Sequence, residues 1–182
     1  MSPTDDDSPA SAAHDAVLEH FAWIDGHADV WSMLRDAATL RRIVTALAEP
    51  FRSSEIDVVV GIESRGFILA PAVALELGAG FAAIRKGDAL FPGEKATEST
   101  APDYRGNTHR LSALTGQFAP GDRVLLVDDW IETGSQARTT RTLIERCEAT
   151  LVGVSVVIDE ASEEARAALP PISRIVSATE LP

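Results

Sequence analysis

The sequence predicts a single α/β domain in which a parallel β-sheet is flanked by helices. Four apolar runs of strand length, at residues 56–62, 81–85, 123–128 and 151–158, are separated by segments of helical length. Continuous apolar runs are typical of strands that are buried on both faces, as the strands of a parallel sheet are. Strands and helices that alternate in this way form crossovers that place helices on both faces of one sheet. A length of 182 residues suits one domain of this kind.

The segment before the sheet is expected to begin with a disordered lead-in over residues 1–13, which are acidic, rich in serine and proline, and unpatterned. Residues 14–21 have the pattern of a short helix. An irregular stretch follows and then a second helix, which we expect Asp36 to cap and Pro50 to close.

From residue 56 onward, each expected strand is followed by an expected helix. The segment at 66–77 is predicted to be a helix that ends at Gly78 and accommodates Pro71. Two more helices are expected at 135–146 and 161–168, and a last strand at 172–176. Residues 86–108 are polar and rich in glycine, proline and threonine, and a loop of that length in a compact domain is usually functional or disordered.

Charge and composition exclude several classes of function. The net charge is −12, from 28 acidic and 16 basic residues, which argues against non-specific binding to nucleic acid or to an anionic membrane. A single cysteine excludes a disulfide framework and a cysteine-based zinc site. The apolar runs are too short to span a membrane, and the acidic N-terminus does not resemble a secretory signal, so we expect a cytoplasmic protein.

Polar residues follow four of the expected strands. In an open parallel sheet, ligands bind at the carboxyl ends of the strands, so these groups are expected to surround one site. The four groups are residues 63–66 (ESRG), Arg85 and Lys86, Asp128 and Asp129, and Asp159 and Glu160.

The segment VLLVDDWIETGSQA, at residues 124–137, contains the most informative pattern. An apolar strand ends in two acids, and a turn with Thr133, Gly134 and Ser135 then leads into a helix. Amide groups and hydroxyls at a helix N-terminus form a cradle for a phosphate group. The alternative is that Thr133 or Ser135 only caps an ordinary helix.

This pattern resembles the signature of the type I phosphoribosyltransferases, which is an apolar strand, two acids, three variable residues and Thr-Gly. ESRGF at 63–67 and RK at 85–86 resemble the adenine branch of that family, and DYRG at 103–106 resembles a motif of its mobile loop. The resemblance covers about residues 50–160, with the motifs in the family's order.

The resemblance implies a Rossmann-like parallel sheet flanked by helices, with a small N-terminal hood at 14–35 in the single domain 14–182 and a mobile loop at 86–108. It implies a pentosyltransferase, a glycosyltransferase that moves ribose 5-phosphate from phosphoribosyl pyrophosphate (PRPP) to a purine base. The implied cofactor is magnesium (Mg²⁺), with Asp129 as an indirect ligand. The implied partners are PRPP, a nucleobase and a second copy of the chain, with no nucleic acid and no membrane.

The family's roles can be carried over residue by residue. Thr133, Gly134, Ser135 and Gln136 fall on the loop that binds the 5-phosphate. Asp128 and Asp129 fall on the acids that hold the ribose hydroxyls. The residues that fall on the pyrophosphate contacts are Ser64, Arg65, Gly66, Arg85 and Lys86, and a non-proline cis peptide is often found in the first of these segments. From the residues alone, Arg65 could instead form a surface ion pair with Glu63, and Arg85 and Lys86 could be a solvated strand end.

Two positions depart from the adenine branch, and a third is a candidate acid that matches it. Glu132 replaces the usual alanine before Thr-Gly, and because a carboxylate beside a phosphate is unfavourable, we expect it to point towards the ribose C1 and the base. Trp130 replaces an aliphatic residue, and its indole is expected to stack on the base, with core packing as the alternative. Asp103 aligns with an acid of the mobile loop. Glu132 and Asp103 are therefore the candidate catalytic carboxylates. The alternatives are that Glu132 only interacts favourably with the helix dipole and that Asp103 is only a solvent-exposed side chain.

The hood and the residues after the fourth strand indicate which base the protein accepts. The hood lacks the Phe-Arg pair of the adenine branch. Trp31 or His27 could take the place of that pair, but we expect Trp31 to be a core residue and His27 to lie at the surface. Asp159 and Glu160 stand where the hypoxanthine–guanine branch has a lysine that reads a carbonyl. A carboxylate accepts a hydrogen bond from an amino group instead, which favours an aminopurine. A PRPP-binding sensor without activity and a transferase for another nucleobase remain as alternatives.

Overall fold

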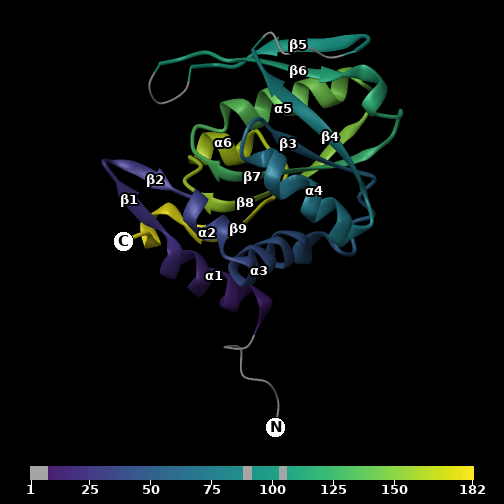
Figure 1. Ribbon diagram of the computed structural model, residues 1–182. Helices are drawn as coiled ribbons and strands as arrows, with labels where there is room; N and C mark the ends of the chain where they lie inside the picture. Colours follow the sequence, from purple (N-terminus) through teal and green to yellow (C-terminus); the bar gives the residue numbers. More distant parts are fainter. Residues whose placement is uncertain (1–7, 88–91, 103–105) are drawn as a thin grey trace.

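The computed structural model describes residues 8–87, 92–102 and 106–182. A seven-stranded sheet has the order β5-β6-β4-β3-β7-β8-β9 (Figure 1). Five of its strands are parallel, which confirms the predicted α/β class; they are β3 (Val58–Ile62), β4 (Gly80–Lys86), β7 (Arg123–Ile131), β8 (Thr150–Asp159) and β9 (Ile172–Ser177). Two antiparallel strands, β5 (Lys95–Ser99) and β6 (Arg110–Leu114), extend the sheet beyond β4.

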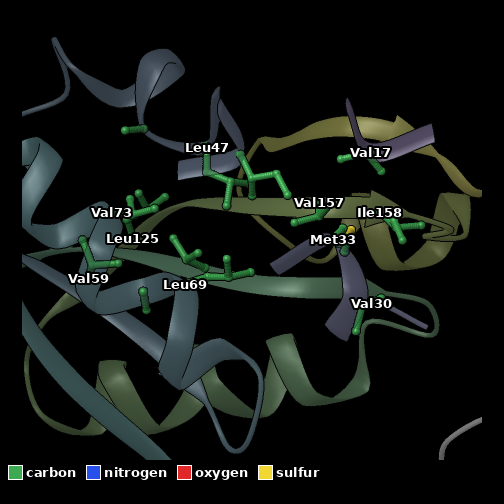
Figure 2. Packing of buried hydrophobic residues seen from close by; sticks show 14 of the residues in the cluster. Val17, Val30, Met33, Leu47, Val59, Leu69, Val73, Leu125, Val157 and Ile158 are labelled. Atoms are coloured by element: carbon green, nitrogen blue, oxygen red, sulfur yellow. The ribbon is translucent and has the colours of Figure 1, made fainter. Parts of the chain in front are cut away.

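Helices cover both faces of the sheet (Figure 1). One face carries α1 (Pro9–His20), α3 (Ala37–Ala48) and α4 (Gly66–Leu77), and the other carries α5 (Ser135–Arg146). Side chains of one strand alternate between the two layers, so Val59 of β3 packs with the first group of helices and Val60 with the second. Figure 2 shows Leu69 and Val73 of α4 directed towards the sheet.

The expected helix bounds at 66–77 and 135–146 are confirmed. Gly78 ends α4 in the left-handed conformation, with φ 69°, and Pro71 lies inside the helix. Asp36 caps α3 as predicted, because its carboxylate accepts a hydrogen bond of 2.8 Å from the Thr39 amide. The short helix α6 covers Glu163–Ala167, inside the range expected for it.

The N-terminal segment differs from the expectation in two ways. Helix α1 begins at Pro9, so disorder at 9–13 was a wrong prediction; the Ser8 hydroxyl caps this helix by accepting from the Ser11 amide at 3.1 Å. Residues 1–7 of the expected lead-in lie outside the described residues. The irregular stretch is instead a hairpin of β1 (Ala22–Ile24) and β2 (His27–Asp29), followed by α2 (Trp31–Arg35).

The segment 86–108 is not a loop throughout. Lys86 ends β4, and β5 lies within the segment, where it pairs antiparallel with β6. The residues of β5 are all exposed or half-buried, which suits an edge strand, and Ala96 is its one apolar residue, so its sequence signal is weaker than the apolar runs of the parallel strands. Residues 88–91 and 103–105 lie outside the described residues, so closure of this segment stays a prediction.

Strand β7 is longer than predicted. It continues to Ile131, three residues beyond the expected end at Asp128, so Asp129 also lies within the strand and not after its end. Pairing with β8 carries it on, since Trp130 is opposite Ile158 and Ile131 is opposite Asp159. Local sequence could not show this extension, because it depends on the neighbouring strand.

An ion pair joins α1 to the C-terminal segment. His14 Nε2 lies 3.1 Å from Glu180 Oε1, and this hydrogen bond is the main cause that raises the pKa of His14 above its ordinary value of 6.5. A raised pKa means that the folded state binds the proton more tightly than the unfolded state. The stabilisation is therefore fully present below pH 6.5 and is lost as the pH rises through the folded-state pKa.

We expect His14→Ala to lower the free energy of unfolding by about 0.5–1 kcal/mol at about pH 5.5, because the partly exposed pair is screened by solvent, and to have little effect at about pH 8.5. Urea unfolding of both proteins at the two pH values measures the difference. An equal loss at both values would show that His14 acts through packing and not through its charge.

Candidate active site

A cleft of about 950 Å³ lies at the carboxyl ends of the parallel strands, where the sequence places its polar groups. The hood hairpin closes one side through Trp23, His27 and Ala28. The predicted site residues that line the cleft are Ser64, Arg65, Lys86, Asp128, Asp129, Trp130, Glu132, Thr133, Gly134, Ser135 and Gln136. Asp103 lies outside the described residues.

The turn after β7 brings the N-terminus of α5 to the cleft. Gly134 is the N-cap, with φ 67°, and as a glycine it offers no side-chain acceptor to the first turn of α5. Thr133 Oγ1 accepts from the Ser135 amide at 3.3 Å, and Ser135, Gln136 and Ala137 all line the cleft. The first-turn amides and the positive end of the helix dipole suit an anion there.

Helix α6 supports this turn from behind. A Cβ atom at Gly134 would lie 2.8 Å from the Cβ of Ala165, which is closer than side chains approach one another. The turn therefore needs glycine for two reasons, its left-handed backbone and the contact with α6. These contacts hold the first turn of α5 in one position relative to the cleft.

The acid pair lies beside this turn. The Asp129 amide donates to Asp128 Oδ1 at 3.0 Å, and Asp129 is almost fully buried. Burial, followed by the adjacent charge of Asp129, raises the pKa of Asp128 well above its ordinary value. Removing water from two adjacent carboxylates is unfavourable, so the pair is suited to a ligand that brings hydroxyl donors or positive charge.

Arg65 neutralises part of this acidic charge. Its Nε atom lies 3.0 Å from Asp129 Oδ2. This ion pair crosses the cleft, because Asp129 lies on β7 and Arg65 immediately precedes α4. The alternative of a surface ion pair with Glu63 is thus wrong. A ligand that takes the Asp129 carboxylate would release the Arg65 guanidinium for another anionic group of the same ligand.

Glu63 pairs instead with β4. It accepts from Arg85 Nε at 3.3 Å and from the Lys86 amide at 3.0 Å, and the Arg85 bond is the main cause that lowers the pKa of Glu63. Arg85 therefore lies behind Glu63 and is not among the described residues that line the cleft, whereas Lys86 is.

The backbone of residues 63–66 runs close to the sheet. The Glu63–Ser64 peptide is cis, as the family resemblance implies. A Cβ at Gly61 would overlap the Gly66 carbonyl oxygen, and one at Gly66 would lie 3.1 Å from Asp128 Oδ1. Gly66 thus brings this loop against the acid pair but does not itself line the cleft.

Aromatic residues form the hood end of the cleft. Trp130 is half-buried and lies against Trp23 of the hairpin, with 6.2 Å between the ring centroids. The sequence analysis assigned no role to Trp23. The hairpin that carries Trp23 could have been recognised from its Asp25-Gly26 turn, in which both residues have positive φ. Trp31 is 53% exposed, so its expected place in the core is wrong, and exposed His27 lines the cleft.

Comparison with known proteins agrees with this geometry. Residues 30–171 match the phosphoribosyl transferase domain family. The adenine phosphoribosyltransferase of Thermobifida fusca is 44% identical over 131 residues, which are 72% of this chain and 73% of that protein. The adenine phosphoribosyltransferase of a Synechococcus strain is 40% identical over 153 residues, 82% of this chain and 86% of that protein.

Solved structures give the same result. Adenine phosphoribosyltransferase from Rhodothermus marinus superimposes with a TM-score of 0.81 at 33% identity, over 92% of this chain and 99% of that one. The enzyme from Saccharomyces cerevisiae, crystallised with an imino-altritol bisphosphate and adenine, gives 0.79 at 26% identity, over 91% and 99%.

Proposed function

Since the chain belongs to the phosphoribosyl transferase domain family, we propose that it is an adenine phosphoribosyltransferase. It transfers ribose 5-phosphate from PRPP to adenine. The bond between ribose C1 and the pyrophosphate oxygen breaks, and a bond between C1 and a ring nitrogen of adenine forms. The proton on that nitrogen leaves the base, and the products are AMP and pyrophosphate.

The observation that carries this proposal is the set of groups that line one cleft. The N-terminus of α5 suits the 5-phosphate, the acid pair suits the ribose hydroxyls, and Arg65 and Lys86 suit the diphosphate. The aromatic end formed with the hood suits a flat base. These are the parts of PRPP and its acceptor: the 5-phosphate, the ribose and, at C1, the diphosphate that leaves and the base that replaces it.

The chain's residues act mainly by positioning and by stabilising charge. As the bond to pyrophosphate breaks, positive charge develops at ribose C1 and negative charge on the leaving group. Arg65 and Lys86 offset the negative charge, and the acid pair orients the ribose ring. Glu132 accepts the proton of the base, and Asp103 of the segment 103–106 is the second candidate for that role.

The acid pair also fits magnesium. Carboxylate oxygens are ligands that Mg²⁺ prefers, and the buried Asp129 Oδ2 accepts no aligned hydrogen bond from a described residue, although Arg65 Nε lies 3.0 Å away as its ion-pair partner. The described residues contain no group of three or more metal-binding side chains, which suits an ion held mainly by substrate oxygens. When bound, magnesium would neutralise part of the diphosphate charge and so make the diphosphate a better leaving group.

An apolar patch supports the proposal that the enzyme is a homodimer. Leu75 of α4 is 84% exposed, and Ile68 on the same helix and Phe81 of β4 are each 39% exposed. The Phe81 ring meets that of Phe67 edge to face, at 6.1 Å between centroids. Large exposed apolar side chains on adjacent elements are typical of association surfaces. Sedimentation equilibrium measures the mass directly.

No helix in residues 8–87, 92–102 and 106–182 has the length and hydrophobicity to cross a bilayer. A cytoplasmic location remains a prediction from the sequence.

A pyrophosphate-release assay with PRPP, magnesium and separate bases tests the function. We expect turnover with adenine and none with hypoxanthine, guanine or orotate. Binding of PRPP without turnover on any base would instead show a sensor, and turnover with another base only would show a different specificity.

A further inference from the structure

Three aromatic rings from separate segments meet at the hood end of the cleft. Phe21 is the residue that ends α1, Trp23 lies on β1 and Trp130 lies on β7. The ring centroids of Phe21 and Trp23 are 5.3 Å apart at 85°, and those of Phe21 and Trp130 are 6.4 Å apart at 45°. These tilted and edge-to-face contacts are favourable geometries for aromatic pairs.

Hydrogen bonds fix both indoles. Trp130 Nε1 donates to Glu160 Oε2 at 3.1 Å, and Glu160 follows β8. Trp23 Nε1 donates to the Pro182 carbonyl oxygen at 2.9 Å. The Trp130 ring is therefore held by aromatic neighbours from the hood and by one carboxylate from the neighbouring strand.

This end of the cleft is open to a ligand. Trp23 is 50% exposed, Trp130 is half-buried, and Trp23, Trp130 and Glu160 all line the cleft. Trp130 is two residues from Asp128, which corresponds to about 7 Å along β7, and Glu132 directly follows the end of this strand. A ligand whose sugar reaches the acid pair can therefore place a flat ring against the indole.

We propose that Glu160 is a positioning residue for the base: through its hydrogen bond to Trp130 Nε1 it holds the indole as the aromatic wall on which the purine stacks. This inference rests on the proposed function and adds to it the residues that select a flat aromatic acceptor. In this role Glu160 uses its Oε2 atom to accept from Trp130 Nε1, and not to accept from an amino group of the base as the sequence suggested. Its effect passes through the orientation of the Trp130 ring.

The proposal predicts a specific kinetic pattern. Trp130→Leu raises the KM for adenine about tenfold, the value expected for the loss of one base–aromatic stack. Glu160→Ala frees the indole and raises the same KM about fivefold, whereas Glu160→Gln keeps an acceptor oxygen and stays within about twofold of the wild type. The KM for PRPP stays unchanged in all three, because the phosphate turn and the acid pair are untouched.

A spectroscopic readout separates stacking from general damage. The chain has three tryptophans, so W23F/W31F leaves Trp130 as the only indole and keeps a ring at position 23. We expect adenine and AMP to quench its fluorescence, and E160A in this background to weaken AMP binding by the same factor as it raises the KM for adenine. Trp31→Leu is the matched control, because Trp31 lies on α2 and is not among the described residues that line the cleft.

The outcomes distinguish this proposal from the function on which it rests. Turnover with adenine, combined with no quenching and an unchanged KM in Trp130→Leu, overturns the aromatic wall and leaves the function intact. Quenching by another base without turnover of adenine overturns the function and supports the wall. An equal effect of Glu160→Ala and Glu160→Gln overturns the positioning role, since Gln retains the hydrogen bond. Each variant's melting temperature shows whether it has folded.

Discussion

Gly134→Ala is expected to raise the KM for PRPP about a hundredfold, the size of effect seen when preorganised donors to an anion are lost. Gly134 has φ 67°, where an alanine costs about 1–2 kcal/mol. Its new Cβ would also lie 2.8 Å from the Ala165 Cβ, so the turn has to move away from α6. The first-turn amides of α5 then no longer face the 5-phosphate.

Gly121→Ala is the matched control. Gly121 has φ 89°, but a Cβ there would meet nothing within 4 Å, and it is not among the described residues of the cleft. It carries a similar backbone cost without displacing the phosphate turn. We expect both variants to lose stability in thermal unfolding, while the KM for PRPP changes only in Gly134→Ala. An unchanged KM in Gly134→Ala would mean that the 5-phosphate does not bind at this turn.

The elements with strong local signals could be predicted from the sequence. Helices α4 and α5 have the expected bounds because Gly78 stops one and the turn at Gly134 starts the other. The parallel strands could be recognised because burial on both faces produces continuous apolar runs. Elements that depend on a partner were missed: β5 is recognisable only beside β6, and the end of β7 only beside β8.

The position of the site could be predicted better than its contacts. Parallel strands end at one edge, so the polar residues that follow them had to meet. The pairing of Arg65 with Asp129, and of Glu63 with Arg85, depends on distances between strands that sequence spacing does not contain. For the same reason, the sequence suggested that Trp130 faces a base but not that Glu160 and Trp23 hold it.

Glu132→Ala is expected to lower kcat about a hundredfold, the lower end of the range for a general base. Glu132 lines the cleft between Trp130 and the phosphate turn, where it can take the proton that the base loses. Glu132→Gln is expected to lower kcat similarly, since an amide keeps the shape but does not accept the proton. Glu164→Ala, at an exposed position of α6, controls for the loss of one negative charge from the chain.

The affinity for PRPP in the absence of base shows where the Glu132 carboxylate points. Two unit charges 4 Å apart interact by about 1 kcal/mol in water and about 4 kcal/mol at an effective dielectric of 20. If Glu132 faced the 5-phosphate, its removal would relieve that repulsion and tighten PRPP binding severalfold or more. We expect the affinity measured by calorimetry to stay within about twofold of the wild type, because the repulsion falls with distance when the carboxylate faces C1 and the base. Weakened PRPP binding with unchanged turnover would show that Glu132 stabilises the phosphate-binding turn. Asp103 would then be the candidate that accepts the proton of the base.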